Sequence, residues 1–171
     1  MTHHEERQAS IEKLNALIKE IKFAMLTTAE SDGTLRSRPM ATQQAPFDGD
    51  LYFFTYGSAP KVEEAQQHHQ VNLSYANPDD NVYVSVSGAA QLLRDRQKME
   101  QLWNPIYKAW FPKGLDEPDI ALLKVNVEQA EYWDSPNNKL VQLGGFVKAL
   151  VTGQQAKGGE NKKLDLERGA S

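Results

Sequence analysis

Two arginines separated by a single residue are the first side chains in this sequence whose spacing suits a chemical task. Arg36 and Arg38 fall in an extended segment, so both side chains leave the same face of the predicted strand, about 7 Å apart. Two guanidinium groups at that distance repel each other unless an anion or water lies between them. The pair therefore indicates either an anion site or two solvated surface arginines, since arginine is mostly exposed in proteins.

Pro39 follows this pair directly. Because proline cannot donate a ladder hydrogen bond, the strand is expected at the edge of a sheet or bulged at this point. Such a break would leave neighbouring backbone groups free to face a ligand. The alternative is an edge strand that is simply protected from pairing with another chain.

A third cation comes from residues 54–61, which run from a predicted strand through a loop into a helix that Ser58 is expected to cap. Lys61 falls in the first turn, where the helix dipole disfavours a cation but favours an anion bound beside it. A phosphate would resolve this conflict. The alternative is that Glu63 and Glu64 compensate the dipole while Lys61 points to water.

Aromatic residues are concentrated after residue 100. They could cover a planar ring or close a subunit interface, and ordinary core packing is the alternative for each one. The residues are Trp103, Tyr107, Trp110, Phe111 and Trp133.

Other common sites are not indicated. The sequence has no cysteine, and His3, His4, His68 and His69 have no metal-ligand spacing joined to a carboxylate motif. It also has no Walker loop, no Gly-x-Ser-x-Gly elbow and no Gly-x-Gly-x-x-Gly after a strand. We therefore expect no metal site.

Length and composition indicate one globular domain. The chain has 171 residues, of which 40% are hydrophobic and 25% charged, and its net charge is −4. Nucleic-acid binding is not expected at this charge, and no apolar run approaches the roughly 20 residues that span a bilayer. Because the first residues do not resemble a secretory signal, we expect a cytoplasmic protein.

Hydrophobic periodicity predicts a largely antiparallel β protein with flanking helices. An amphipathic helix is expected at about 5–21, and Ala130–Trp133 is expected to form a hairpin with the strand before it. The secondary structure of residues 140–151 stays open. The polar residues 153–171 are expected to form a flexible tail. The remaining strands are predicted at 23–28, 34–42, 51–55, 71–75, 82–92 and 120–127. Strands joined by tight turns suggest a closed or nearly closed barrel in residues 1–152, with the helices outside.

Several segments, in their order and spacing, resemble the general stress protein branch of the pyridoxamine 5'-phosphate oxidase-like family. They cover residues 10–152, and no single motif is decisive. The segments are Arg36-Ser37-Arg38-Pro39-Met40, Leu51-Tyr52-Phe53-Phe54-Thr55, Ser58 with Lys61, residues 82–88, residues 103–114 and Ala130-Glu131-Tyr132-Trp133.

This resemblance implies a split antiparallel β-barrel, FMN as the cofactor and a homodimer with the flavin at the subunit interface. It implies that Arg36 and Lys61 bind the flavin phosphate, assisted by Ser58 or nearby backbone N–H groups. It further implies that Ser37, Arg38, Pro39 and Met40 run along the isoalloxazine edge, and that Phe54 and Thr55 contact the ribityl chain and phosphate. Trp110 and Trp133 are candidates for the ring side or for contact with the partner subunit.

The function that the resemblance implies is a flavin-dependent oxidoreductase of unknown substrate. Family oxidases end in a basic, aromatic segment that helps bind the substrate phosphate, whereas this chain ends in a polar one. Pyridoxamine phosphate is therefore not the expected substrate. A non-catalytic flavin carrier or sensor, and a barrel that binds deazaflavin or haem instead, remain alternatives.

Overall fold

A computed structural model describes residues 1–135, 147–153 and 159–169. The helices are α1 (His3–Ile18), α2 (Pro60–Gln67) and α3 (Arg96–Leu102), with 3-10 turns η1 (Pro105–Ala109) and η2 (Gly114–Asp116). The strands are β1 (Phe23–Ala29), β2 (Leu35–Ala41), β3 (Asp50–Tyr56), β4 (Gln70–Asn77), β5 (Val82–Leu93), β6 (Ile120–Asp134) and β7 (Glu160–Asp165).

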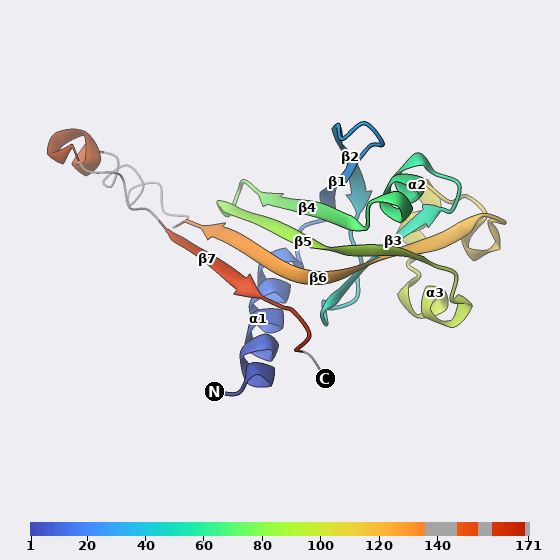
Figure 1. The fold of residues 1–171 in the computed structure, drawn as a ribbon, viewed down its shortest axis with the longest axis horizontal. Helices are drawn as coiled ribbons and strands as arrows, with labels where there is room; N and C mark the ends of the chain where they lie inside the picture. Colours follow the sequence, from blue (N-terminus) through green and yellow to red (C-terminus); the bar gives the residue numbers. More distant parts are fainter. Residues whose placement is uncertain (136–146, 154–158, 170–171) are drawn as a thin grey trace.

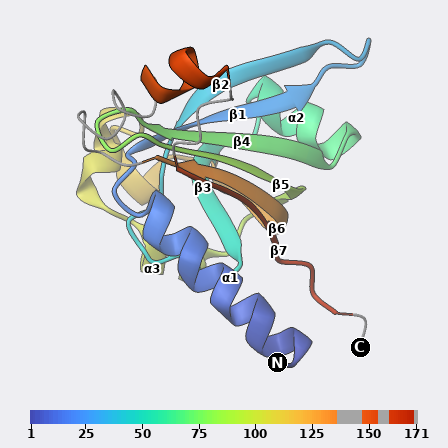
Figure 2. The same cartoon turned by 90° about the vertical axis from the view of Figure 1, so that its left-hand side faces the viewer.

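The strands form one antiparallel sheet in the order β2-β1-β4-β5-β6-β3, and β7 pairs with β6 beside β3. Figure 2 shows this sheet curling from β2 toward β6 and β7, with α1 beneath it. The two end strands of the order, β2 and β3, are not paired with each other in the part of the chain that the structure describes. The barrel is therefore split, as predicted, and the gap between β2 and β3 is its seam.

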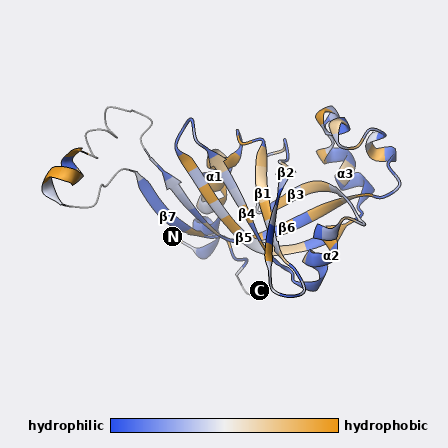
Figure 3. Cartoon of the chain, turned by 90° about the horizontal axis from the view of Figure 1, so that it is seen from above, coloured by the Kyte–Doolittle hydropathy of each residue, from blue (hydrophilic) through white to orange (hydrophobic). Residues whose placement is uncertain are grey.

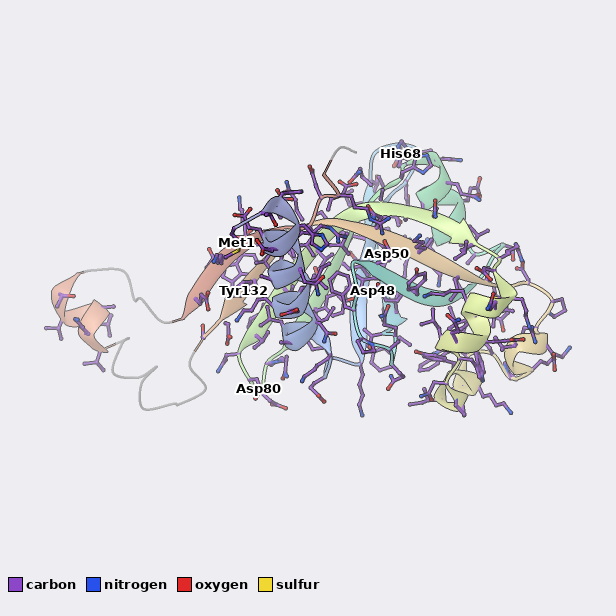
Figure 4. The ribbon with its side chains drawn as sticks, turned by 90° about the horizontal axis from the view of Figure 1, so that it is seen from below. Met1, Asp48, Asp50, His68, Asp80 and Tyr132 are labelled. Carbon is purple, nitrogen blue, oxygen red and sulfur yellow. The ribbon has the colours of Figure 1, made fainter. Side chains whose placement is uncertain are left out.

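Helix α1 covers the apolar inner face of the sheet. It begins with a capping box, in which Thr2 Oγ1 accepts from the Glu5 N–H at 3.2 Å and Glu5 Oε2 accepts from the Thr2 N–H at 2.7 Å. Its buried residues join the main core, which also contains Tyr132 of β6, labelled beside the helix in Figure 4. The helix ends three residues earlier than predicted, and Ile21 is buried outside it.

Strand β6 corrects one sequence-based expectation. Residues 130–133 do not form a second strand of a hairpin, because β6 is continuous and pairs with β5 along nearly its whole length. The register shifts by one residue beside Gly88, where Glu128 bulges out, and the polar Glu128-Gln129 pair belongs to this bulge. Any side chain at Gly88 would meet the carbonyl oxygen of Asn126 at 2.2 Å, so glycine is required there.

The prediction that residues 153–171 form a flexible tail is wrong for the described residues 160–166. Residues 160–165 form β7, and Leu164 and Leu166 are buried in the main core. The Leu166 N–H donates to the Glu128 carbonyl at 2.8 Å, and Arg7 Nε donates to the Leu166 carbonyl at 3.1 Å. The local polarity of this segment gave no sign of a partner, because the free edge of β6 that it pairs with exists only in the folded sheet. Residues 147–152 form a short helix, whereas 140–146 lie outside the described residues.

Helices α2 and α3 lie at the same end of the sheet, away from β7 (Figures 1 and 3). Pro60 is the first residue of α2, and Asp95 caps α3 by accepting from the Lys98 N–H. Ser58 does not cap α2, because the capping position is Ala59, which has no side-chain hydrogen bond. None of the described helices is long and apolar enough to cross a membrane.

Candidate functional site

The seam between β2 and β3 opens into a pocket of about 260 Å³. Its walls come from the end of β2, the end of β3, the start of α2 and the turns that follow α3. The lining residues are Phe23, Pro39, Met40, Ala41, Phe54, Thr55, Tyr56, Ala59, Lys61, Tyr107, Trp110 and Phe111. One end of this pocket carries the cation Lys61 and the other carries aromatic rings, whereas the predicted Arg36 and Arg38 are not among the lining residues.

The two faces of β2 separate its predicted site residues. Arg36 and Arg38 share a face with the buried Met40, as their spacing predicted, because their register partners on β1 are the buried Thr28 and Leu26. Ser37 lies on the opposite face, where its hydroxyl is hydrogen-bonded to that of Thr27 at 2.6 Å. β2 pairs with β1 alone among the described strands, which confirms the edge position that Pro39 predicted.

Arg38 is held by protein partners. Its Nη2 donates to Glu64 Oε2 at 2.8 Å and its Nη1 to Thr28 Oγ1 at 2.5 Å, and the Thr28 hydroxyl donates in turn to the same Glu64 oxygen. Burial works to raise the pKa of Glu64, but the hydrogen bonds from Thr28 and Arg38 lower it on balance. This carboxylate is therefore ionised and tied to Arg38, which leaves Arg38 less able than Arg36 to bind a ligand.

Arg36 and Lys61 lie near this ion pair and differ from Arg38. Arg36 lies on the α2 side of the barrel, because it pairs in register with Thr28, whose hydroxyl donates to Glu64 of α2. Its positive charge also contributes to the lowered pKa of Glu64. Burial lowers the pKa of Lys61, and the nearby charge of Arg38 lowers it further. Neither Arg36 nor Lys61 makes an ion pair with a carboxylate of residues 1–135, 147–153 or 159–169.

We refer to Arg36, Arg38, Lys61 and Glu64 as the seam cluster. Three cations and one carboxylate leave it with two excess positive charges. Arg38, Lys61 and Glu64 are partly buried, and Arg36 is exposed. A group with excess charge of one sign is stabilised by an anion placed among its members. The polar end of the pocket therefore favours an anionic ligand.

Ser58, which the family resemblance gives as an assisting phosphate ligand, is hydrogen-bonded to Asp119. Its hydroxyl donates to Asp119 Oδ2 at 2.6 Å, and its backbone N–H donates to the same oxygen at 3.0 Å. The hydroxyl proton is thus used within the protein. Nothing in the sequence around Ser58 indicates this partner, which lies 61 residues further along the chain.

The other end of the pocket is a packed aromatic wall. Phe54 lies 5.2 Å from Tyr107 and 5.3 Å from Trp103 between ring centroids, and the Tyr56 and Phe111 rings are 4.9 Å apart. These separations suit edge-to-face and offset ring pairs.

Two further contacts fix the rim of this wall. The Tyr56 hydroxyl donates to the Trp110 carbonyl at 3.1 Å. Phe23 and Trp110 form an edge-to-face pair at 5.9 Å, although both are about half exposed. A planar ring would find apolar surface on this side of the pocket.

Trp133 is not part of this pocket. It lies at the far end of β6, opposite Tyr83 of β5 and Asn161 of β7. Ile120, which pairs with Tyr56 at the pocket, is 13 residues away, or roughly 40 Å along the strand by its rise. Within one chain Trp133 cannot touch a ligand in the seam, so only its predicted role toward a partner subunit stays open.

The structure thus brings together six of the predicted residues in the pocket lining: Pro39, Met40, Phe54, Thr55, Lys61 and Trp110. Sequence reasoning named Tyr107 and Phe111 only as part of an aromatic area. It missed four lining residues: Phe23, Ala41, Tyr56 and Ala59. The available signal for Phe23 was an aromatic residue at the start of the predicted strand, residues 23–28. The roles of Glu64 and Asp119 had no local signal.

Fold and site together define a split-barrel protein with an aromatic-lined pocket at its seam and excess positive charge beside it. A model of the pyridoxamine 5'-phosphate oxidase like family matches residues 9–157. The chain belongs to this family.

Several known proteins are similar to this chain in sequence or in fold. The protein bli-3 of Neurospora crassa is 30% identical over 156 residues, which cover 85% of this chain and 75% of bli-3. A solved structure of a protein related to general stress protein 26, from Clostridium acetobutylicum, has a TM-score of 0.67 at 18% identity and covers 93% of this chain and 96% of its own. The general stress FMN/FAD binding protein of Xanthomonas citri has a TM-score of 0.63 at 26% identity, with 76% and 89% covered.

Proposed function

We propose that this chain is an FMN-binding protein that holds the flavin phosphate between Arg36 and Lys61. The observation that carries the proposal is a pair of cations without carboxylate partners in the described chain. Lys61 lines the aromatic-walled pocket, and Arg36 lies on β2, the strand that supplies Pro39 to Ala41 to the same pocket. A hydrogen bond to a charged group contributes on the order of 1.5 to 3 kcal/mol. The name of the Xanthomonas citri relative supports a flavin as the ligand class.

The residues present fit such a ligand. A phosphoryl group carries about −1.5 to −2 charges at neutral pH, which matches the two excess positive charges of the seam cluster. The match favours FMN, a phosphate monoester, over a flavin whose phosphate is esterified on both sides. Backbone groups of the edge strand at Pro39 to Ala41 would face the ring, and the aromatic wall would cover it.

We further propose that the protein, with FMN bound, acts as an oxidoreductase of unknown substrate. The flavin would supply the hydride or electron chemistry, and the chain would bind it, orient it and limit its contact with water. The pocket lining contains no carboxylate or histidine among the described residues. The protein's own task would thus be positioning rather than proton transfer, which a non-catalytic carrier or sensor would share.

A homodimer completes this proposal. A volume of about 260 Å³ is below the 300 to 1,000 Å³ usual for pockets that enclose a cofactor-sized ligand. Phe23, Met25, Tyr83 and Trp133 are each more than two-fifths exposed on the outer face of the sheet. A second copy of the chain packed on this face would cover these side chains and enclose the flavin. We also propose a cytoplasmic location, which the absence of cysteine supports.

The absorption spectrum of the purified protein tests flavin binding directly, and chromatography of the released chromophore tells FMN from FAD and riboflavin. Stoichiometric FMN supports the proposal, whereas a colourless protein that takes up no added FMN overturns it. Reduction of the bound flavin by a nicotinamide nucleotide, faster than that of free flavin, would favour the enzyme over the carrier. Light scattering of the FMN-loaded protein tests the dimer.

A further inference from the structure

Asp119 contacts the loop that precedes α2. Its Oδ2 accepts from the backbone N–H of Ser58 at 3.0 Å and from the Ser58 hydroxyl at 2.6 Å. Its own carbonyl accepts from the Gly57 N–H at 2.8 Å. These three bonds fix the loop residues that lie immediately before Lys61 in the sequence.

Arg94 completes this arrangement from another part of the chain. Its Nη2 donates to Asp119 Oδ1 at 3.2 Å, and it packs so closely on Gly57 that a Cβ there would lie 2.1 Å from the guanidinium. Glycine at position 57 therefore makes room for Arg94. We call Asp119, Arg94, Ser58 and Gly57 the Asp119 clamp.

The clamp joins the two walls of the pocket. Arg94 lies between β5 and α3, and Asp119 lies between η2 and β6, so both flank the segment that carries Tyr107, Trp110 and Phe111. Ser58 belongs instead to the loop that leads to Ala59 and Lys61. Asp119 is therefore the point at which the aromatic segment is tied to the polar wall.

We propose that Asp119 is a positioning residue for phosphate recognition, because it holds the start of α2 in the place where Lys61 reaches the ligand phosphate. This inference rests on the proposed FMN function and adds to it a residue that does not touch the ligand. The Asp119 carboxylate uses both of its oxygens for protein partners.

The clamp is suited to this role rather than to holding the fold. The side chains of Arg94 and Asp119 are 51% and 39% exposed, and exposed ion pairs contribute little to stability. Hydrogen bonds from the Ser58 side chain and backbone, and then the one from Arg94, lower the pKa of Asp119. Asp119 is therefore charged at neutral pH, as the clamp requires.

If the Asp119 carboxylate acted only through its charge, its removal would have the opposite effect on phosphate binding from that expected of a positioning residue. Removing a negative charge near a phosphate site should tighten phosphate binding if charge alone matters. Loosening the clamp should weaken it, because Lys61 would no longer be held in place. Riboflavin, which has the same ring and ribityl chain without the phosphate, should be insensitive to either effect.

The experiment compares Asp119→Asn with Asp116→Asn in the full chain, with FMN and riboflavin titrated separately by fluorescence. Asp116 is exposed in η2, three residues away, so its substitution removes the same charge without touching the clamp. We expect Asp119→Asn to raise the Kd for FMN about tenfold and to leave the Kd for riboflavin and the melting temperature nearly unchanged. Asp116→Asn should change neither Kd.

Ser58→Ala is a second variant that tests the clamp, and it changes no charge. If Asp119 positions the loop, Ser58→Ala and Asp119→Asn should both weaken FMN binding; if Ser58 is itself a phosphate ligand, only Ser58→Ala should do so. Unchanged or tighter FMN binding in Asp119→Asn overturns the inference, as does equal weakening for riboflavin. Should Asp119→Asn fail to fold, unchanged FMN binding in Ser58→Ala would overturn it. A wild-type protein that binds no FMN would instead refute the proposed function.

Discussion

In two regions of this protein, several cations lie around a single carboxylate. The regions differ in how many of these cations form an ion pair with it. Asp50, labelled in Figure 4, is buried at the start of β3. Its Oδ2 lies 2.9 Å from Arg168 Nη2 and 3.7 Å from Lys124 Nζ, and its Oδ1 accepts from Asn126 Nδ2 at 2.9 Å. We call these four residues the Asp50 cluster.

The seam cluster contrasts with this arrangement. Its carboxylate, Glu64, is paired with Arg38 alone, while Arg36 and Lys61 make no ion pair within the described residues. In the Asp50 cluster every cation contacts the carboxylate, so the charges act within the fold. In the seam cluster the excess charge lies beside a pocket and is available to a ligand. A cation is available to bind a ligand when no carboxylate of the protein pairs with it, whatever the number of cations nearby.

The largest effect that would test this contrast comes from reversing the charge of Lys61. We expect Lys61→Glu to raise the Kd for FMN by at least about 100-fold, because a favourable contact with the phosphate becomes a repulsion. Fluorescence titration measures this change. Lys162→Glu, the same reversal on an exposed residue of β7, is the matched control and should bind FMN normally. Equal affinities in the two variants would contradict the role of the seam cluster.

Asp50→Asn should show the reverse behaviour. Loss of the carboxylate leaves Arg168 and Lys124 without their partner, so we expect the free energy of unfolding to fall by about 1 to 3 kcal/mol. Urea denaturation measures this loss. The Kd for FMN should change by less than about twofold, and a large change would mean that the two clusters are coupled.

Glu64→Gln sharpens the comparison within the seam. The substitution removes the negative charge and loosens the hold on Arg38, so we expect FMN to bind about fivefold more tightly while stability falls slightly. Calorimetric titration gives the affinity. Glu63→Gln, on the exposed side of α2, is the control and should have no effect. Weaker binding in Glu64→Gln would show that the ion pair is needed to shape the site.

The smallest expected effect is a pH dependence from Lys61. Burial and the charge of Arg38 lower the pKa of Lys61 below its ordinary value of 10.5. A bound phosphate favours the protonated amine, so FMN affinity should be complete below the lowered pKa and decline as pH rises through it. Lys61→Arg should abolish this decline, because arginine stays charged. A decline that persists in Lys61→Arg would have to come from another group.

Much of the architecture followed from the sequence alone, because it depends on neighbours in the chain. The alternation of β2 placed Arg36 and Arg38 on one face, and the missing donor of Pro39 predicted an edge strand. Pro60 at the start of α2 and Asp95 at the cap of α3 act through local geometry. These features are local, so a single sequence contains the information they need.

Only the tertiary structure decided which charges were left for a ligand. Arg38 and Arg36 look alike in sequence, yet Glu64 contacts one of them through a helix 26 residues away. Ser58 was paired with Asp119, and β7 formed because β6 extends past β3 and leaves an edge for it. Each of these contacts is made with a residue far along the chain. A local sequence pattern does not contain the information that determines which distant residue will lie nearby in the fold.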